Sequence, residues 1–251
     1  MPREGTLWRE GEDTIHDPKL EKTAMNKKQK RQNFWFYHKW HVIIALAVVI
    51  IGGYFIYDVL HKTEYDYTIG LITEESVPTD IVGRMENLIS EKGEDLNGDG
   101  QVLVHIENYI VASEGESAAN PNMQMASVTK LMSDMSSMQS VIFFTDDKSF
   151  QRYQKDSTAF SYLDGTTPKD GADDYDKMRL PWEDLTALSA GDWTFYGKDT
   201  DGKDIPVDVS GDMKNLSASL RVFEGTDFAK DEAKASYYQK NVELLKALQG
   251  K

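Results

Sequence analysis

The 251-residue sequence contains no cysteine, which excludes a disulfide framework, a thiolate metal site and a cysteine nucleophile. The usual catalytic signatures are also missing, because no G-x-S-x-G, G-x-x-x-x-G-K-[ST] or H-E-x-x-H pattern occurs. Histidine is scarce after residue 60, where only His61 and His105 remain. These absences favour a protein that is not an enzyme.

Positive charge is scarce in the C-terminal part of the chain. Residues 1–39 hold nine Lys/Arg and six Asp/Glu, whereas residues 62–251 hold nineteen Lys/Arg and thirty-five Asp/Glu, a difference of −16. An acidic domain repels nucleic-acid phosphates, so we expect no nucleic-acid partner. The negative charge is typical of a soluble surface, and it also allows attraction of cations or basic partners.

One long apolar run interrupts this polar sequence. Val42 to Tyr57 is uninterrupted, and Trp40 to Leu60 approaches the ~20 residues that cross a bilayer. Aromatic residues stand at both ends of the run, as is typical of membrane interfaces. The sequence therefore predicts a transmembrane helix over residues 40–60.

The flanks of this run predict its orientation. Lysines and an arginine, in KKQKR and at Lys39, precede the run, and acidic residues follow it, which keeps the N-terminus in the cytoplasm. The following sequence IYDVLHKTEYDY offers no small-x-small cleavage site, so we expect an uncleaved signal-anchor. The polar tail, residues 1–39, is predicted to be cytoplasmic and disordered, and its basic cluster acts as a topology signal or contacts anionic lipid. The remaining domain is expected outside the cell membrane.

Residues 62–251 predict one α/β domain. YTIGLIT (67–73) and QVLVHIENYIV (101–111) are typical of strands, and residues 78–91 between them have helical spacing. Strand, helix and strand in this order indicate a parallel pair with a right-handed crossover. Further elements are expected in chain order as a helix over 121–137, a strand over 140–147, a helix over 148–156, a hairpin around 201–204, a strand over 216–223 and a helix over 231–249.

This pattern predicts a three-layer α/β domain with a mostly parallel sheet. The order of elements also resembles one lobe of the type II extracellular solute-binding proteins, with SVIFFTDD (140–147) and FSYLD (160–164) matching phrases of that family. The FWFYHKWH–span–YTIGLIT start is similar to that of uncharacterised membrane-anchored bacterial proteins. The domain is too short for two lobes, so the resemblance implies the fold of one lobe and not ligand clamping between two.

A calcium loop is one candidate site. Asp95, Asn97, Asp99 and Gln101 place oxygen-bearing side chains at alternate positions, with Gly100 at the sixth position of an EF-hand-type loop. The twelfth position, which should carry an acid, is Ile106. The alternative interpretation is an Asx-rich turn between a helix and a strand.

Two further sites are candidates. Asp146 and Asp147 end a predicted parallel strand, where α/β folds place ligands, although such residues also cap helices. Ser127 and Lys130 form an S-x-x-K pattern of the kind found in penicillin-binding enzymes, but the further motifs of that family are missing. His105 and Glu107 fall on one face of their strand, where a solvated pair is expected.

We therefore expect a membrane-anchored, non-enzymatic binding or assembly module that recognises a protein partner or a small ligand. No cofactor is expected, with calcium as the one candidate. The alternatives are a calcium-binding structural or adhesion domain, and a serine cell-wall hydrolase that uses Ser127 and Lys130. The expected partners are the lipid bilayer and another membrane or extracellular protein.

Overall fold

The computed structural model describes residues 26–60, 63–111 and 121–250. The chain divides into two compact units, Met1–Thr63 and Glu64–Lys251. The predicted disorder of the tail falls mainly on residues 1–25, outside the described residues.

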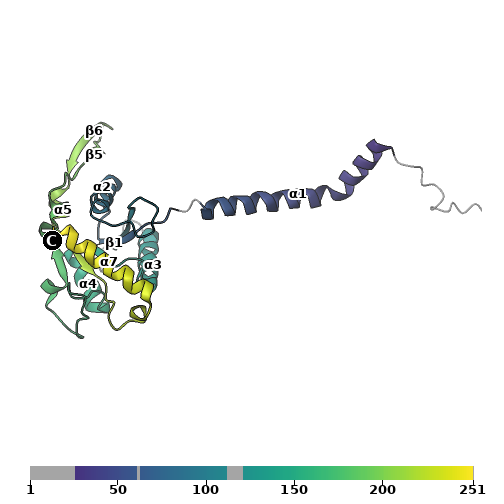
Figure 1. Cartoon of the computed structure of the whole chain (residues 1–251). Coiled ribbons are helices and arrows are strands. Elements are labelled where there is room, and N and C mark those ends of the chain that lie inside the picture. The colour runs from purple at the N-terminus through teal and green to yellow at the C-terminus, as the bar shows by residue number, and fades with distance from the viewer. Residues whose placement is uncertain (1–25, 61–62, 112–120, 251) are drawn as a thin grey trace, which may run out of the picture. The chain divides into compact units, whose positions relative to one another are not determined.

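The described part of the N-terminal unit forms helix α1 (Lys27–Leu60), which bends in its N-terminal part (Figure 1). It is long and apolar enough to cross a membrane. Its large apolar side chains are between 38% and 71% exposed among the described residues. The predicted helix over 40–60 lies inside α1, which begins 13 residues earlier, at Lys27.

The C-terminal unit begins with a β-α-β unit. Strand β1 (Tyr67–Thr73) leads into α2 (Thr79–Ser90) and then β2 (Val104–Ile110). The two strands pair in parallel, from Tyr67 opposite Val104 to Thr73 opposite Ile110. Helix α2 starts directly after Pro78, whose fixed φ suits this position, and the parallel pairing confirms the sequence prediction.

A second crossover places the third strand on the other side of β1. Helix α3 (Pro121–Ser137) precedes β3 (Ile142–Thr145), which pairs in parallel with β1 and is followed by α4 (Asp147–Ser157). All four residues of β3 are buried, as its apolar sequence predicts. The strand is shorter at both ends than the predicted range 140–147.

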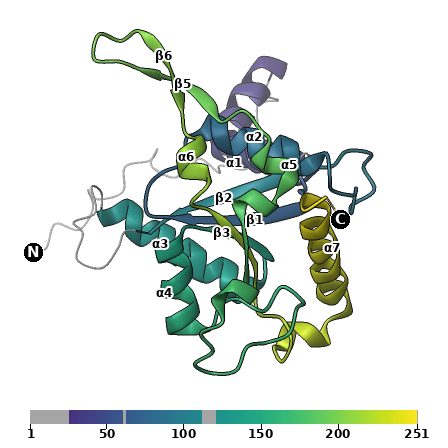
Figure 2. The ribbon, with the colours of Figure 1, turned by 90° about the vertical axis from the view of Figure 1, so that its left-hand side faces the viewer.

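The rest of the unit adds short elements. These are η1 (Tyr175–Lys177), β4 (Arg179–Pro181), η2 (Trp182–Asp184), α5 (Thr186–Ser189), β5 (Thr194–Lys198), β6 (Asp204–Asp208), α6 (Ser210–Met213), β7 (Ser217–Leu220), η3 (Asp227–Lys230) and α7 (Glu232–Leu248). Strands β5 and β6 form the predicted hairpin, which extends away from the main sheet (Figure 2). Helix α7 begins at the N-cap Asp231, whose carboxylate accepts from the amides of Ala233 and Lys234.

The main sheet is mixed. Its order is β2-β1-β3-β7-β4, and β7 runs antiparallel to both β3 and β4. The expectation of a mostly parallel sheet is therefore not confirmed, since two of the four pairings are antiparallel. All four residues of β7 are buried. The strand shows no alternation between buried and exposed residues, because it lies between β3 and β4.

Two apolar clusters form the core. The larger contains Ile69 and Leu71 of β1 with side chains of α2 and α7. The smaller contains Ile72 of β1 and Phe143 of β3 with side chains of α3 and α4. Neighbouring residues of β1 thus contribute to different clusters, as expected where side chains alternate along a buried strand.

Candidate functional site at the carboxyl ends of β1 and β3

The connections that follow the neighbouring strands β1 and β3 lead to different core clusters. The chain leaves β1 for α2, whose side chains lie in the larger cluster, and leaves β3 for α4, whose side chains lie in the smaller one. In open α/β sheets with parallel neighbours, ligands bind at the carboxyl ends of the strands where successive connections diverge in this way. Asp146 and Asp147 follow β3 at this point, and Glu74 follows β1.

Asp146 holds the two strand ends together. One of its carboxylate oxygens, Oδ1, accepts from the Ser149 amide at 2.7 Å, which makes Asp146 the N-cap of α4. The other oxygen, Oδ2, accepts from the Glu74 amide at 2.9 Å. Both oxygens of the predicted ligand Asp146 are therefore engaged in fixing the backbone. Its neighbour Asp147 lies in the first turn of α4, where its negative charge is favourable.

Two ion pairs surround this junction. Asp147 pairs with Arg179 of β4, and the guanidinium of Arg179 lies 5.3 Å from the ring centre of Phe150. Lys148 Nζ lies 2.7 Å from Glu74 Oε2. The side chain of Asp147 is 69% exposed, so it is accessible to a partner from outside. The strand ends thus present alternating negative and positive groups.

Glu74 has the feature most suggestive of a missing ligand. Its second carboxylate oxygen, Oε1, is buried and has no hydrogen-bond partner within the described part of the chain. Asn108 Oδ1 near the end of β2 and Thr145 Oγ1 at the end of β3 are in the same condition. Buried polar atoms are usually paired, so the unpaired oxygen of Glu74 indicates a place where an N–H donor is absent.

Sequence reasoning missed Glu74 and Arg179. Glu74 directly follows the strand over 67–73, just as Asp146 follows its strand, so the same rule would have selected it. Arg179 gave no such signal, because it belongs to a three-residue strand that the local sequence did not predict. Its role depends on the pairing of β4 with β7, which the local sequence does not indicate.

The predicted calcium loop forms a network of turns. Asp95 accepts from the Gly98 amide at 2.6 Å and from the Gly100 amide at 2.8 Å. Asn97 Oδ1 accepts from the Asp99 amide, and Asp99 Oδ1 accepts from the Gln101 amide, each at 2.8 Å. These bonds are those of an Asx-rich turn. Among the described residues, no group of three or more His, Cys, Asp or Glu side chains is arranged to hold a metal ion. Calcium binding by Asp95, Asn97, Asp99 and Gln101 stays a prediction.

The hydrogen bonds that backbone amides donate to Asp95 make the stability of the domain depend on pH. Hydrogen bonds from the amides of Gly100 and Gly98 lower the pKa of Asp95. A depressed folded-state pKa adds stability above the unfolded value of about 3.9, and this contribution is lost as pH falls through the folded value. We expect urea unfolding between pH 6 and pH 3 to show a smaller decrease in stability for Asp95→Asn than for the wild type. Equal slopes for the two proteins would contradict this expectation.

The S-x-x-K pair lies on α3, near a second group of charges. Lys130 Nζ lies 2.6 Å from Glu107 Oε1, so its ammonium is held by a carboxylate of β2. His105 lies between Glu86 and Glu107, with both nitrogen–oxygen distances at 3.4 Å, and its ring stacks on Tyr65 at 4.8 Å. The predicted pairing of His105 with Glu107 on one strand face is therefore present, as part of a larger charged group. The Ser127 side chain is partly buried.

Comparison with known proteins adds no support to these site assignments, which rest on the geometry of the structure. No protein-family model, curated protein or solved structure matches this chain. The chain has one N-terminal helix fit to cross a membrane and a C-terminal α/β unit with a mixed five-stranded sheet.

Proposed function

We propose that the protein is a single-pass membrane protein whose α/β domain is a non-enzymatic binding or assembly module outside the cell. The N-terminus lies in the cytoplasm, because the lysine-rich flank precedes the span. The domain has helices on both faces of its sheet in three layers, similar to one solute-binding lobe. Support for the layers comes from the two clusters, which take alternate residues of β1.

The unpaired oxygen of Glu74 carries the proposal of a binding site. A buried carboxylate oxygen without a donor is costly, and a ligand that supplies an N–H group restores the missing bond. The nearby Asp147 is exposed and negatively charged, and the whole domain is acidic. We infer that the site at the ends of β1 and β3 recognises a cationic nitrogen group, such as a lysine or arginine side chain of a protein partner.

A binding measurement with a pentalysine peptide tests this proposal. Full-length protein in nanodiscs of neutral phosphatidylcholine is titrated calorimetrically, and Glu74→Gln combined with Asp147→Asn is expected to weaken binding by about ten-fold. Hydrogen bonds to charged groups contribute about 1.5–3 kcal/mol, and each 1.4 kcal/mol corresponds to about ten-fold in affinity.

The matched control removes the same amount of charge elsewhere. Asp201→Asn with Asp212→Asn changes two exposed acids that lie outside the strand ends. An equal loss of affinity in both double variants would show that the peptide responds to the general negative charge of the domain. That result would refute the site. The orientation is tested separately, because a protease added outside intact cells should digest the C-terminal domain. An undigested domain would refute the proposed topology.

A calcium-binding structural domain stays the alternative function. Its support is the alternate spacing of Asp95, Asn97 and Asp99, whose oxygen-bearing side chains lie in one turn. The loop is fastened to the sheet by Asp66, which accepts from the amides of Leu96 and Leu103 at 2.7 Å each. The serine hydrolase has no comparable support, because Lys130 pairs with Glu107.

A further inference from the structure

Helix α1 is longer than a bilayer requires. Its 34 residues span about 51 Å, whereas the hydrocarbon core of a bilayer is about 30 Å thick. When the apolar run 42–57 occupies that core, the segment 27–39 extends into the headgroup layer or beyond it. Residues 27–39 are called the basic–aromatic segment below, because they combine Lys and Arg with Phe, Trp and Tyr.

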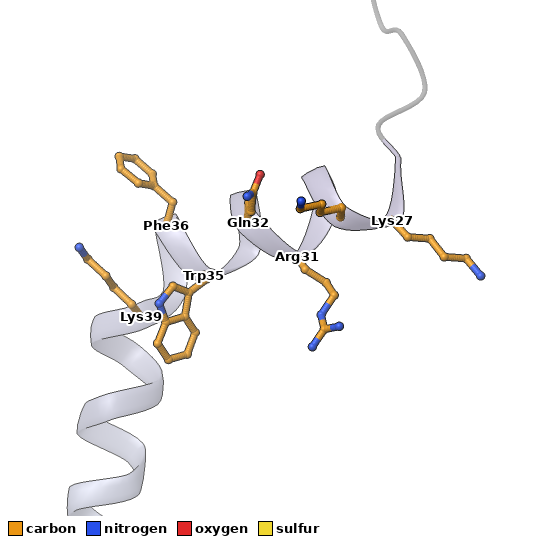
Figure 3. Close-up of a pocket in the computed structure, with 7 residues that line it drawn as sticks. Lys27, Arg31, Gln32, Trp35, Phe36 and Lys39 are labelled. Atoms are coloured by element: carbon orange, nitrogen blue, oxygen red, sulfur yellow. The ribbon is translucent and has the colours of Figure 1, made fainter.

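The basic–aromatic segment forms a concave surface. A hollow of about 650 Å³ is lined by Lys27, Lys28, Arg31, Gln32, Trp35, Phe36 and Lys39. Figure 3 shows the helix changing direction near Trp35 and Lys39, with the side chains of Arg31 and Trp35 on the same side of the helix. Spacing by four residues explains this, since Lys27, Arg31, Trp35 and Lys39 follow one another along one helix face.

The cations of this segment have no acidic partner in the described helix. Five Lys or Arg side chains lie between residues 27 and 39, and within residues 26–60 the only carboxylate is Asp58. Asp58 is 19 residues beyond Lys39, which corresponds to about 28 Å along a helix. No ion pair joins it to the segment among the described residues.

The aromatic residues favour the membrane interface. Phe34, Trp35, Phe36 and Tyr37 are consecutive, so their rings point in all directions around the helix, and each is more than half exposed. Such amphipathic rings are stable at the headgroup level, where one end is apolar and the other wet. Cations at the same depth therefore lie among the phosphates of the lipids.

We propose that the basic–aromatic segment binds anionic phospholipid headgroups in the leaflet that surrounds it, beyond its part as a topology signal. Arg31 donates to a phosphate, because its guanidinium presents paired donors that suit phosphate oxygens. Lys27, Lys28 and Lys39 contribute positive charge around the same hollow, and Trp35 lies against the lipid glycerol region. This inference rests on the proposed insertion of α1 into the membrane.

Quenching of tryptophan fluorescence by brominated lipids tests the inference. Full-length protein with Trp8→Phe is reconstituted in nanodiscs that contain brominated phosphatidylglycerol or brominated phosphatidylcholine. Trp182 and Trp193 are buried in the other unit and only 2% exposed, so the signal that changes comes from Trp35 and Trp40. The association constant for phosphatidylglycerol should exceed that for phosphatidylcholine by at least about five-fold, since a single basic residue near an anionic surface already contributes about that factor.

Charge removal and charge exchange serve as the paired variants. Replacing all five cations of the segment by glutamine (Lys27, Lys28, Lys30, Arg31 and Lys39) should bring the ratio of the two association constants near one. Lys27→Arg, Lys28→Arg and Lys39→Arg keep the charge and should keep the ratio. A ratio of one in the wild type, an unchanged ratio in the glutamine variant, or displacement of the lipid by millimolar inorganic phosphate would overturn the inference.

Extraction with alkaline carbonate distinguishes failure of the headgroup site from failure of the proposed membrane anchor. Protein that resists extraction but shows no lipid preference refutes only the headgroup site. Protein that carbonate extracts refutes the membrane anchor and the headgroup site together.

Discussion

Replacing Asp134 by alanine is expected to lower the free energy of unfolding of the α/β unit by about 3–5 kcal/mol. Asp134 lies on α3, is 1% exposed, and accepts from Tyr109 Oη at 2.7 Å. It also accepts from the amide and the hydroxyl of Ser140, at 2.7 and 2.5 Å. The variant leaves these buried donors without an acceptor, and each loss costs about 1–3 kcal/mol.

Arg221 adds to the cost of this variant. Its guanidinium is buried, and burial lowers the pKa of Arg221 while the negative charge of Asp134 opposes that decrease. Without Asp134, the buried guanidinium of Arg221 loses a nearby negative charge, while its own hydrogen bonds go to the carbonyls of Met135 and Ser140. Burial raises the pKa of Tyr109, and its hydrogen bond to Asp134 raises it further, so the phenol remains a donor.

Urea unfolding followed by the fluorescence of the buried Trp182 and Trp193 measures the effect. Ser136→Ala is the control on the same helix, because Ser136 is exposed and bonds only to the Ser133 carbonyl among the described residues. Its effect should stay within about 0.5 kcal/mol. A loss below 1 kcal/mol for Asp134→Ala would show that water replaces the carboxylate and that the network contributes little.

Introducing alanine at Gly70 is expected to destabilise the same unit by about 1–3 kcal/mol. Gly70 lies in the middle of β1, opposite Phe143 of the neighbouring strand β3. A Cβ atom at residue 70 would overlap the Phe143 ring, which is fully buried and packs edge-on against Phe160. The ring has no space to move, so the strands must separate or Phe143 must leave its rotamer.

A second substitution distinguishes this clash from a general loss of strand stability. Gly70→Ala with Phe143→Leu should be more stable than the sum of the single effects, because the smaller side chain gives room to the new methyl group. Gly83→Ala in α2 is the control, since a Cβ there meets nothing within 4 Å and the helix gains from alanine. Strict additivity of the two single effects would contradict the proposed overlap.

The sequence indicated where the candidate site lies in the sheet, but it did not indicate which side chains pair with the acidic residues there. Asp146 and Asp147 lie at the carboxyl end of β3 as the sequence indicated, because a buried apolar run followed by acids marks a strand end. The structure assigns Asp146 to capping and strand fastening. Lys148 pairs with Glu74, and Arg179 pairs with Asp147. These ion pairs depend on the direction of the Lys148 side chain and on the pairing of β4 with β7, neither of which local periodicity indicates.

The sequence by itself determined the apolar helix, the β-α-β unit, the helices over α3, α4 and α7, and the β5–β6 hairpin. Each of these depends on local periodicity, capping or turn residues, which are readable in consecutive positions. Only the tertiary structure decided the antiparallel insertion of β7 between β3 and β4 and the burial of Asp134 beside Tyr109 and Ser140. These features depend on which distant segments pack together, because burial and hydrogen-bond pairing of a polar group are properties of its neighbours in space.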